Sequence, residues 1–300
     1  MNILVTGGVG FVGTNLIKKL LSKGYQVISV DNYSTGKKEN EQKGCKYYYK
    51  DLANTQWWAL WDEDYCEWSC DCQIEPVDVI YHLAALPRIT PSFKKPVDTF
   101  KSGPMATINV LEWARHHETP VIYAGSSSVT GDVYANPYTF TKWQNEHLMK
   151  LYNELFNVPM SICRFYNVYG EHQANEGSYC NVLGIFERLY KEGKPLTITG
   201  DGEQRRDFTY VGDVVDANIK ASNSKNVGNG EVINIGNGDN RSINEIAAMI
   251  GGPTEEVEPV IEPKETLAYN GKAKFMLDWK STTTLEEWIP KWKKDIGLVK

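Results

Sequence analysis

No apolar run in this 300-residue chain approaches the roughly 20 residues that a membrane-spanning helix requires. The N-terminus also lacks a basic segment and a cleavage site, and residues 2–5 already enter a strand-like run, so no signal peptide is expected. Excess positive charge is absent as well, because the formal net charge is −6 and no basic face is evident. We therefore expect a cytoplasmic globular protein that binds neither a membrane nor nucleic acid.

Cysteine is scarce, with six in the chain, and three of them lie close together at Cys66, Cys70 and Cys72. A structural zinc site usually takes two well-spaced pairs of ligands, and a fourth ligand is missing here. We expect no metal site and interpret the cysteines as reduced thiols.

Tryptophan is concentrated in residues 54–75, which hold Trp57, Trp58, Trp61 and Trp68. This segment is interpreted either as a helix that covers a sheet edge or as a surface for a partner. Packing is the favoured interpretation.

Short apolar runs alternate with amphipathic stretches through the first half of the chain. The apolar runs predict strands at residues 3–6, 25–30, 46–49, 77–83, 121–124 and 160–165. Helical periodicity predicts helices at 11–23 and 98–117, the second with an irregularity near Pro104. This alternation predicts an α/β fold, a Rossmann-type doubly wound parallel sheet with helices on both faces.

The second half of the chain is richer in Gly, Pro and Asn, and its elements are shorter. We predict a strand at 231–236, a helix at 242–250 that Ser242 would cap, and a helix at 285–292.

A glycine-rich loop joins the first predicted strand to the first predicted helix. The spacing of Gly7, Gly10 and Gly13 suits a tight turn that a pyrophosphate approaches closely, at a helix N-terminus that binds the anion. Asp31 ends the second strand, where a carboxylate accepts hydrogen bonds from the adenine ribose and repels a 2′-phosphate. The sequence therefore predicts that the cofactor is NAD.

Further cofactor contacts are expected from the start of the first helix and from the ends of the predicted strands. They are Phe11, Val12, Asn32, Asp51, Leu52, Leu83, Ala84 and Ala85. Among them, Asp51 and Leu52 would line the adenine pocket.

Tyr138 and Lys142 begin a predicted amphipathic helix just after Pro137. Their spacing of four places both side chains on one helical face. The serine run 126–128 follows a predicted strand, and ligands of open parallel sheets bind at that end of the strands. These groups are candidates for proton transfer beside the cofactor.

Together these motifs resemble the extended short-chain dehydrogenase/reductase family over almost the whole chain. The resemblance also includes residues 82–85, 164–170, 200–211 and 234–236. Within that family the chain is most similar to UDP-galactose 4-epimerases and related nucleotide-sugar epimerases, which implies a homodimer paired through helices near 98–117 and 138–155. It also implies that residues 1–165, with a returning strand near 231–236, bind NAD. Residues 166–300 would then form a smaller C-terminal α/β region that binds a nucleotide sugar, expected to be a UDP-hexose.

The resemblance implies that Ser126, Tyr138 and Lys142 are the catalytic residues, with Ser127 and Ser128 as alternatives to Ser126. Tyr138 would take the proton of the C4 hydroxyl while NAD takes the hydride, and the hydride would return to the other face of a transient 4-keto sugar. A tyrosine of pKa about 10 must lose about three units to act at pH 7, or about 4 kcal/mol. Lys142 and a cationic nicotinamide can each supply about that much, less the cost of desolvation.

Three further residues are expected to bind the substrate. By resemblance, Asn167 and Arg206 would contact the nucleotide diphosphate, and an arginine fork matches phosphate oxygens. The alternative for Arg206 is an ion pair with Asp207 or Asp213. Arg88, shortly after a predicted strand, is the third candidate.

The chain departs from the family pattern in three places. Residues 129–131 read Val-Thr-Gly where the family has Val-Tyr-Gly, and the stretch from Gly131 to Tyr138 is short, which suggests a larger or different sugar. Residues 262–265 read Glu-Pro-Lys-Glu where the family has Arg-Pro-Gly-Glu. That change removes one diphosphate arginine, for which Lys264 is a partial substitute, and leaves the nucleotide open.

Ser127 and Ser128 also separate the candidate reactions. Nucleotide-sugar 4,6-dehydratases carry Asp-Glu there and decarboxylases carry Glu at the second position, so both are disfavoured. A 4-reductase and a non-catalytic NAD-binding protein are the remaining alternatives, and the complete catalytic set argues against the second. We therefore predict an NAD-dependent 4-epimerase of a UDP-hexose.

Overall fold

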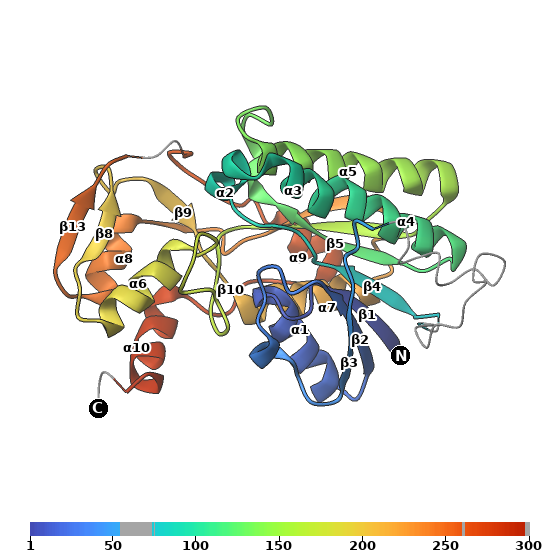
Figure 1. Ribbon diagram of the computed structural model, residues 1–300, viewed down its shortest axis with the longest axis horizontal. Helices are drawn as coiled ribbons and strands as arrows, with labels where there is room; N and C mark the ends of the chain where they lie inside the picture. The colour runs from blue at the N-terminus through green and yellow to red at the C-terminus, as the bar shows by residue number, and fades with distance from the viewer. Residues whose placement is uncertain (55–73, 75, 260–261, 298–300) are drawn as a thin grey trace.

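The computed structural model describes residues 1–54, 74, 76–259 and 262–297 (Figure 1). Its centre is a seven-stranded sheet with the order β11-β6-β5-β4-β1-β2-β3, and every neighbouring pair is parallel. The strands are β1 (Asn2–Thr6), β2 (Gln26–Asp31), β3 (Cys45–Tyr49), β4 (Val79–His82), β5 (Val121–Ser126), β6 (Met160–Phe165) and β11 (Asn229–Ile235). The predicted Rossmann-type parallel sheet is confirmed.

Helices cover both faces of this sheet because its strands are apolar on both sides. Ile3 and Val5 of β1 lie in one core, and Leu4 lies in the other, as the two-residue repeat of a strand requires. The helices on the Ile3 side are α1 (Phe11–Ser22), α7 (Val211–Asn223) and α9 (Gly271–Leu277). On the Leu4 side lie α4 (Ala106–His116) and α5 (Pro137–Phe156), together with α2 (Ile89–Lys94) and α3 (Pro96–Phe100) (Figure 1).

The helix predicted over 98–117 is divided into three parts. A π-helical turn, Lys101–Met105, joins α3 to α4 and contains Pro104. Proline has no N–H to donate and its ring collides with the preceding turn, so regular α-helical bonding is interrupted there. The irregularity near Pro104 was correctly predicted, although its π-helical form was not.

The rest of the second half of the chain packs around a third core beyond the edge of the sheet. Its elements are β7 (Val168–Tyr169), α6 (Val182–Lys191), β8 (Leu196–Thr199), β9 (Arg205–Asp207), β10 (Thr209–Tyr210), β12 (Asn240–Ser242), α8 (Ile243–Ile250), β13 (Thr254–Val257) and α10 (Leu285–Asp295). Ser242 caps α8 as predicted, in a capping box with Glu245.

Two segments interpreted from the sequence lie outside the described residues. Trp57, Trp58, Trp61 and Trp68 and the cysteines at 66, 70 and 72 fall among the residues that the structure does not describe. In the described part of the chain, no helix is both long and apolar enough to span a membrane.

Candidate active site

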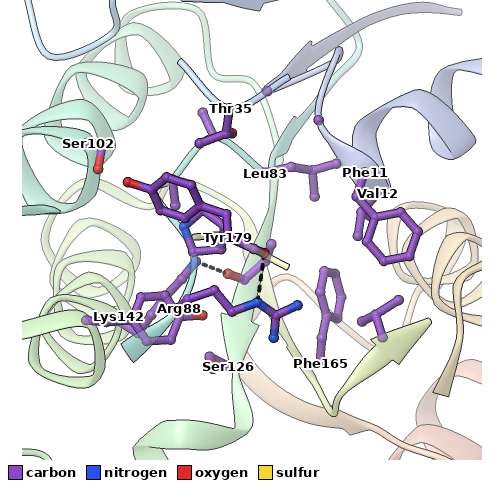
Figure 2. A pocket seen from close by; sticks show the side chains of 18 of the residues that line it. Phe11, Val12, Thr35, Leu83, Arg88, Ser102, Ser126, Lys142, Phe165 and Tyr179 are labelled. Carbon is purple, nitrogen blue, oxygen red and sulfur yellow. Dashed lines mark hydrogen bonds between the residues drawn. The ribbon is translucent and has the colours of Figure 1, made fainter. Parts of the chain in front are cut away.

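One pocket of about 510 Å³ lies at the carboxyl ends of the central strands and extends toward the third core (Figure 2). This volume is typical of a small-molecule site. All of the predicted cofactor, catalytic and substrate residues line it. They are Gly7, Gly10, Phe11, Val12, Gly13, Asp31, Asn32, Asp51, Leu52, Leu83, Ala84, Ala85, Arg88, Ser126, Tyr138, Lys142, Asn167 and Arg206. The predicted residues, which are up to 199 positions apart in the chain, thus share one cavity, since parallel strands end at one edge of a sheet.

The glycine loop lines the pocket at the N-terminal end of α1. Gly7 has a φ of +74°, and a Cβ there would lie 2.9 Å from the Ala84 Cα. A Cβ on Gly13 would lie 2.2 Å from the Gly7 carbonyl oxygen. The Gly10 N-cap makes no side-chain hydrogen bond, which leaves first-turn N–H groups of α1 available to an anion. This backbone cradle fits a dinucleotide pyrophosphate.

Asp31 lies at the end of β2, where its carboxylate is held by backbone donors. Its Oδ2 accepts the Val9 N–H at 3.1 Å and its Oδ1 accepts the Tyr33 N–H at 2.8 Å. Burial raises the pKa of Asp31, and these hydrogen bonds oppose the rise. A carboxylate oxygen accepts more than one bond, so this geometry leaves acceptor sites for ribose hydroxyls.

His82, which the resemblance included, contributes to the fold rather than to the chemistry of the site. Its ring nitrogens lie 2.8 Å from the Thr6 Oγ1 and 3.0 Å from the Thr107 Oγ1. Burial lowers its pKa to about 3, so the ring is neutral. Thr6 Oγ1 also accepts the N–H of Ala84, and this network therefore positions the pocket wall at Ala84.

Ser126, Tyr138 and Lys142 meet between β5 and the start of α5. Asn136 caps α5 by accepting the Thr139 N–H at 2.8 Å, which places Tyr138 in its first turn. The Ser126 Oγ lies 3.0 Å from the Ser128 Oγ, while the Lys142 Nζ donates to the Ala124 carbonyl at 2.7 Å.

Burial governs the electrostatics of these groups. It lowers the pKa of Lys142 to about 8. It raises the pKa of Tyr138, and the Ser126 hydroxyl and the Arg88 cation oppose that rise. The Arg88 cation is thus a charged neighbour of Tyr138 that the sequence did not indicate, in addition to the expected Lys142. Side chains alone leave Tyr138 protonated near neutral pH, so a base role needs another positive charge in the pocket.

Arg206 is already paired in the structure. Its Nη2 donates to the Glu262 Oε2 at 2.6 Å, and its Nη1 donates to the Arg205 carbonyl at 2.8 Å. The alternative partners, Asp207 and Asp213, were wrong, because their carboxylates accept hydrogen bonds from backbone N–H and hydroxyl groups instead. Glu262, at the position of the missing family arginine, thus neutralises the predicted diphosphate arginine.

Asn167, which was also predicted to contact the nucleotide diphosphate, has hydrogen-bond partners within the chain as well. Asn167 directs its side-chain N–H groups to the Asp207 carbonyl and to the Thr266 Oγ1, each at 3.0 Å. Both amide hydrogens are used, so its side chain holds the wall together rather than offering donors to a phosphate. Lys264, considered as a partial substitute for the lost arginine, does not line the pocket.

Arg88 shows a contact that the sequence did not indicate. Its Nε donates to the Tyr179 carbonyl at 3.2 Å, and Figure 2 shows the guanidinium within the pocket, near Phe165. Tyr179 was not predicted, because its backbone oxygen makes the contact and a carbonyl carries no residue-specific signal.

The doubly wound sheet, the glycine cradle and the Ser126–Tyr138–Lys142 cluster define a dinucleotide-dependent enzyme of the short-chain dehydrogenase/reductase type. The sequence profile of the NAD dependent epimerase/dehydratase family matches residues 3–236. The chain belongs to that family, and its cofactor is NAD.

Three relatives show the range of activities nearby. The chain is 36% identical to a putative UDP-glucose 4-epimerase of Methanocaldococcus jannaschii, over 83% of this chain and 81% of the relative. It is 31% identical to a UDP-N-acetyl-alpha-D-glucosaminuronate decarboxylase of Bacillus cytotoxicus, over 86% and 82%. The crystal structure of UDP-glucuronic acid 4-epimerase from Bacillus cereus, with UDP-glucuronic acid and NAD, superimposes with a TM-score of 0.85 at 30% identity, covering 99% of this chain and 100% of that one. Epimerases and decarboxylases of UDP-sugars are thus both close in sequence.

Proposed function

We propose that this protein is an NAD-dependent 4-epimerase of a UDP-hexose. The observation that carries the proposal is the pocket in which Ser126, Tyr138 and Lys142 share one cavity with the glycine cradle. Residues 1–165, with β11, would hold NAD, and residues 166–300 would hold the nucleotide sugar.

The catalytic roles follow from the geometry of these side chains. Tyr138 is the base that takes the proton of the sugar C4 hydroxyl, and Ser126 hydrogen-bonds the same hydroxyl. Lys142, anchored on the Ala124 carbonyl, keeps a positive charge behind Tyr138 below its pKa of about 8. When bound, oxidised NAD supplies a hydride acceptor and the additional positive charge that the side chains alone do not provide.

A decarboxylase is the second candidate, and the relative from Bacillus cytotoxicus is the observation that favours it. Ser127 and Ser128 line the pocket where acid groups would be expected for dehydration or decarboxylation. Neither serine provides a carboxyl group for such a step, so we favour epimerisation.

The function is tested with pure protein and no added cofactor. The substrates tested are UDP-galactose, UDP-glucose, their N-acetyl forms and UDP-glucuronate. We expect NMR to show that at least one of these UDP-sugars is converted to its C4 epimer. The cofactor is regenerated in each cycle, so none needs to be added. Loss of CO2 or of water would replace the epimerase assignment, and an absence of any change would indicate a non-catalytic NAD-binding protein.

The Arg206–Glu262 ion pair makes a prediction about substrate affinity. We expect Glu262→Gln to lower the KM for the UDP-sugar about fivefold, which is about 1 kcal/mol, because it frees the Arg206 fork for the diphosphate. Steady-state kinetics would measure this effect. Glu258→Gln makes the same charge change at an exposed position and is the control. A KM that is unchanged or higher in Glu262→Gln would contradict the role given to Arg206.

We also propose that the protein is a homodimer. Apolar side chains on the helices that cover one face of the sheet are exposed, among them Val97 at 63% and Leu155 at 63%. These residues belong to α3 and α5, which lie side by side (Figure 1). Exposed apolar surface of this kind is typical of an interface. A mass close to the 34.0 kDa of one chain in light scattering would contradict the proposal.

A further inference from the structure

Arg88 projects a cation into the pocket from a strained backbone position. It precedes α2 with φ and ψ of 84° and 141°, a combination that side-chain-bearing residues rarely adopt. Such strain persists where the surrounding structure holds it, and it often marks a functional site. The strained backbone here places an arginine, rather than a glycine, at the mouth of the reacting centre.

The Arg88 guanidinium has only part of its hydrogen-bonding capacity satisfied by the protein. Its Nε donates to the Tyr179 carbonyl, which fixes the orientation of the fork (Figure 2). Within the described residues, its two terminal nitrogens make no hydrogen bond and no ion pair. Burial also lowers the pKa of this group, so holding its charge in the pocket costs free energy that a bound anion would offset.

The carboxylates that line the pocket do not supply that anion. Glu262 is paired with Arg206. Asp31 and Asp51 lie at the ends of β2 and β3, in the part of the pocket assigned to the adenosine of NAD. No carboxylate of the described residues therefore pairs with the Arg88 fork, which leaves the fork to a ligand.

The position of Arg88 indicates which part of the ligand carries the charge. Arg88, Ser126 and Tyr138 line the same pocket, and the Arg88 cation opposes the rise in the pKa of Tyr138, so Arg88 lies near the group that meets C4 of the sugar. The substituent of C5 is adjacent to C4, whereas the diphosphate is attached at C1 on the opposite side of the ring. Because the NAD pyrophosphate is assigned to the glycine cradle at the start of α1, the remaining charge that can face Arg88 is one on C5.

We propose that Arg88 binds a carboxylate on C5 of the sugar, and that the substrate is a UDP-uronic acid rather than a neutral UDP-hexose. The guanidinium fork matches a carboxylate in a bidentate pair, with the Tyr179 carbonyl holding the third donor. This inference rests on the proposed function, since it assumes that a UDP-sugar places C4 at Tyr138.

The test compares UDP-glucuronate with UDP-glucose on the holoenzyme. We expect the kcat/KM of the wild-type enzyme to favour UDP-glucuronate by at least about 100-fold, because the neutral sugar leaves the buried fork without a partner. Arg88→Met should lower the ratio of the two kcat/KM values about 100-fold, and Arg88→Lys, which keeps the charge but not the fork, should give an intermediate ratio. Arg115→Met, which removes an exposed arginine, is the control and should leave the ratio unchanged.

Other outcomes overturn the inference. A wild-type enzyme that prefers UDP-glucose would overturn it. An Arg88→Met variant that loses activity equally on both sugars would also overturn it, because an equal loss would indicate that Arg88 acts on Tyr138 alone. If Arg88→Met does not fold, the wild-type ratio and Arg88→Lys decide. If neither sugar is epimerised, the proposed function fails. Calorimetry then still tests Arg88 by measuring the affinity of the holoenzyme for UDP-glucuronate and for UDP-glucose. Equal affinities would refute the carboxylate site.

Discussion

Replacing Tyr138 by phenylalanine is expected to lower kcat at least about 1,000-fold while leaving the bound NAD and the melting temperature near their wild-type values. The substitution removes one oxygen, the only group of this side chain that can take a proton from the sugar. The ring keeps its place, because the Asn136 cap and the Tyr138 backbone N–H, which donates to the Ser92 Oγ at 3.2 Å, are unaffected.

The measurement is turnover followed by NMR, with NAD content and thermal unfolding determined on the same sample. Tyr134→Phe is the matched control, since Tyr134 is 77% exposed on the preceding loop and does not line the pocket. Its activity should equal that of the wild type. A Tyr138→Phe variant that keeps more than about a tenth of the activity would remove Tyr138 from the reaction.

Gly13→Ala is expected to abolish NAD retention and to lower the melting temperature. The new Cβ would lie 2.2 Å from the Gly7 carbonyl oxygen and 2.8 Å from the Gly8 Cα. These are backbone atoms, which cannot rotate aside as a side chain does, so the loop must open and α1 must shift. A displaced loop no longer forms the pyrophosphate cradle, and overpacking of this kind costs about 1–3 kcal/mol or more.

NAD released by denaturing the purified variant measures this effect, and we expect less than about a tenth of the wild-type content. Gly131→Ala is the control, because Gly131 has a φ of −99° and its Cβ would lie 3.8 Å from the nearest atom, the Ser128 carbonyl oxygen. That variant should retain its NAD. Wild-type NAD content in Gly13→Ala would show that the loop tolerates a side chain at this position. It would also show that binding does not need the close approach of the pyrophosphate to the loop backbone.

Several local features could be predicted because neighbouring residues determine them. The strand at 160–165 was placed at the bounds that β6 has, and the first helix ends one residue earlier than predicted. The Ser242 cap depends on a hydrogen bond between residues three apart, which the sequence displays directly. The sheet followed from the alternation of apolar runs with helical periods, since each strand had to be covered on both faces.

The sequence predicted which residues line the pocket, but not which of them form hydrogen bonds and ion pairs with one another. The sequence identified Arg206, Asn167 and Arg88 as pocket residues, and all three line the cavity. It did not show that Glu262 takes the Arg206 fork, although the departure from the family pattern at residue 262 was visible in the sequence. It also did not show that the Arg88 cation opposes the rise in the pKa of Tyr138.

The sequence by itself therefore determined the glycine loop, the seven strands of the central sheet, the family and the set of side chains at the carboxyl ends of those strands. Only the tertiary structure decided which of these side chains already form a hydrogen bond or an ion pair within the chain. Arg206 and Glu262 are 56 residues apart, and Arg88 and Tyr179 are 91 apart. Such contacts depend on how separate segments are brought together by the packing of the sheet and the third core, and no local propensity encodes them. For that reason the charge left open for a ligand, at Arg88, became visible only in the folded chain.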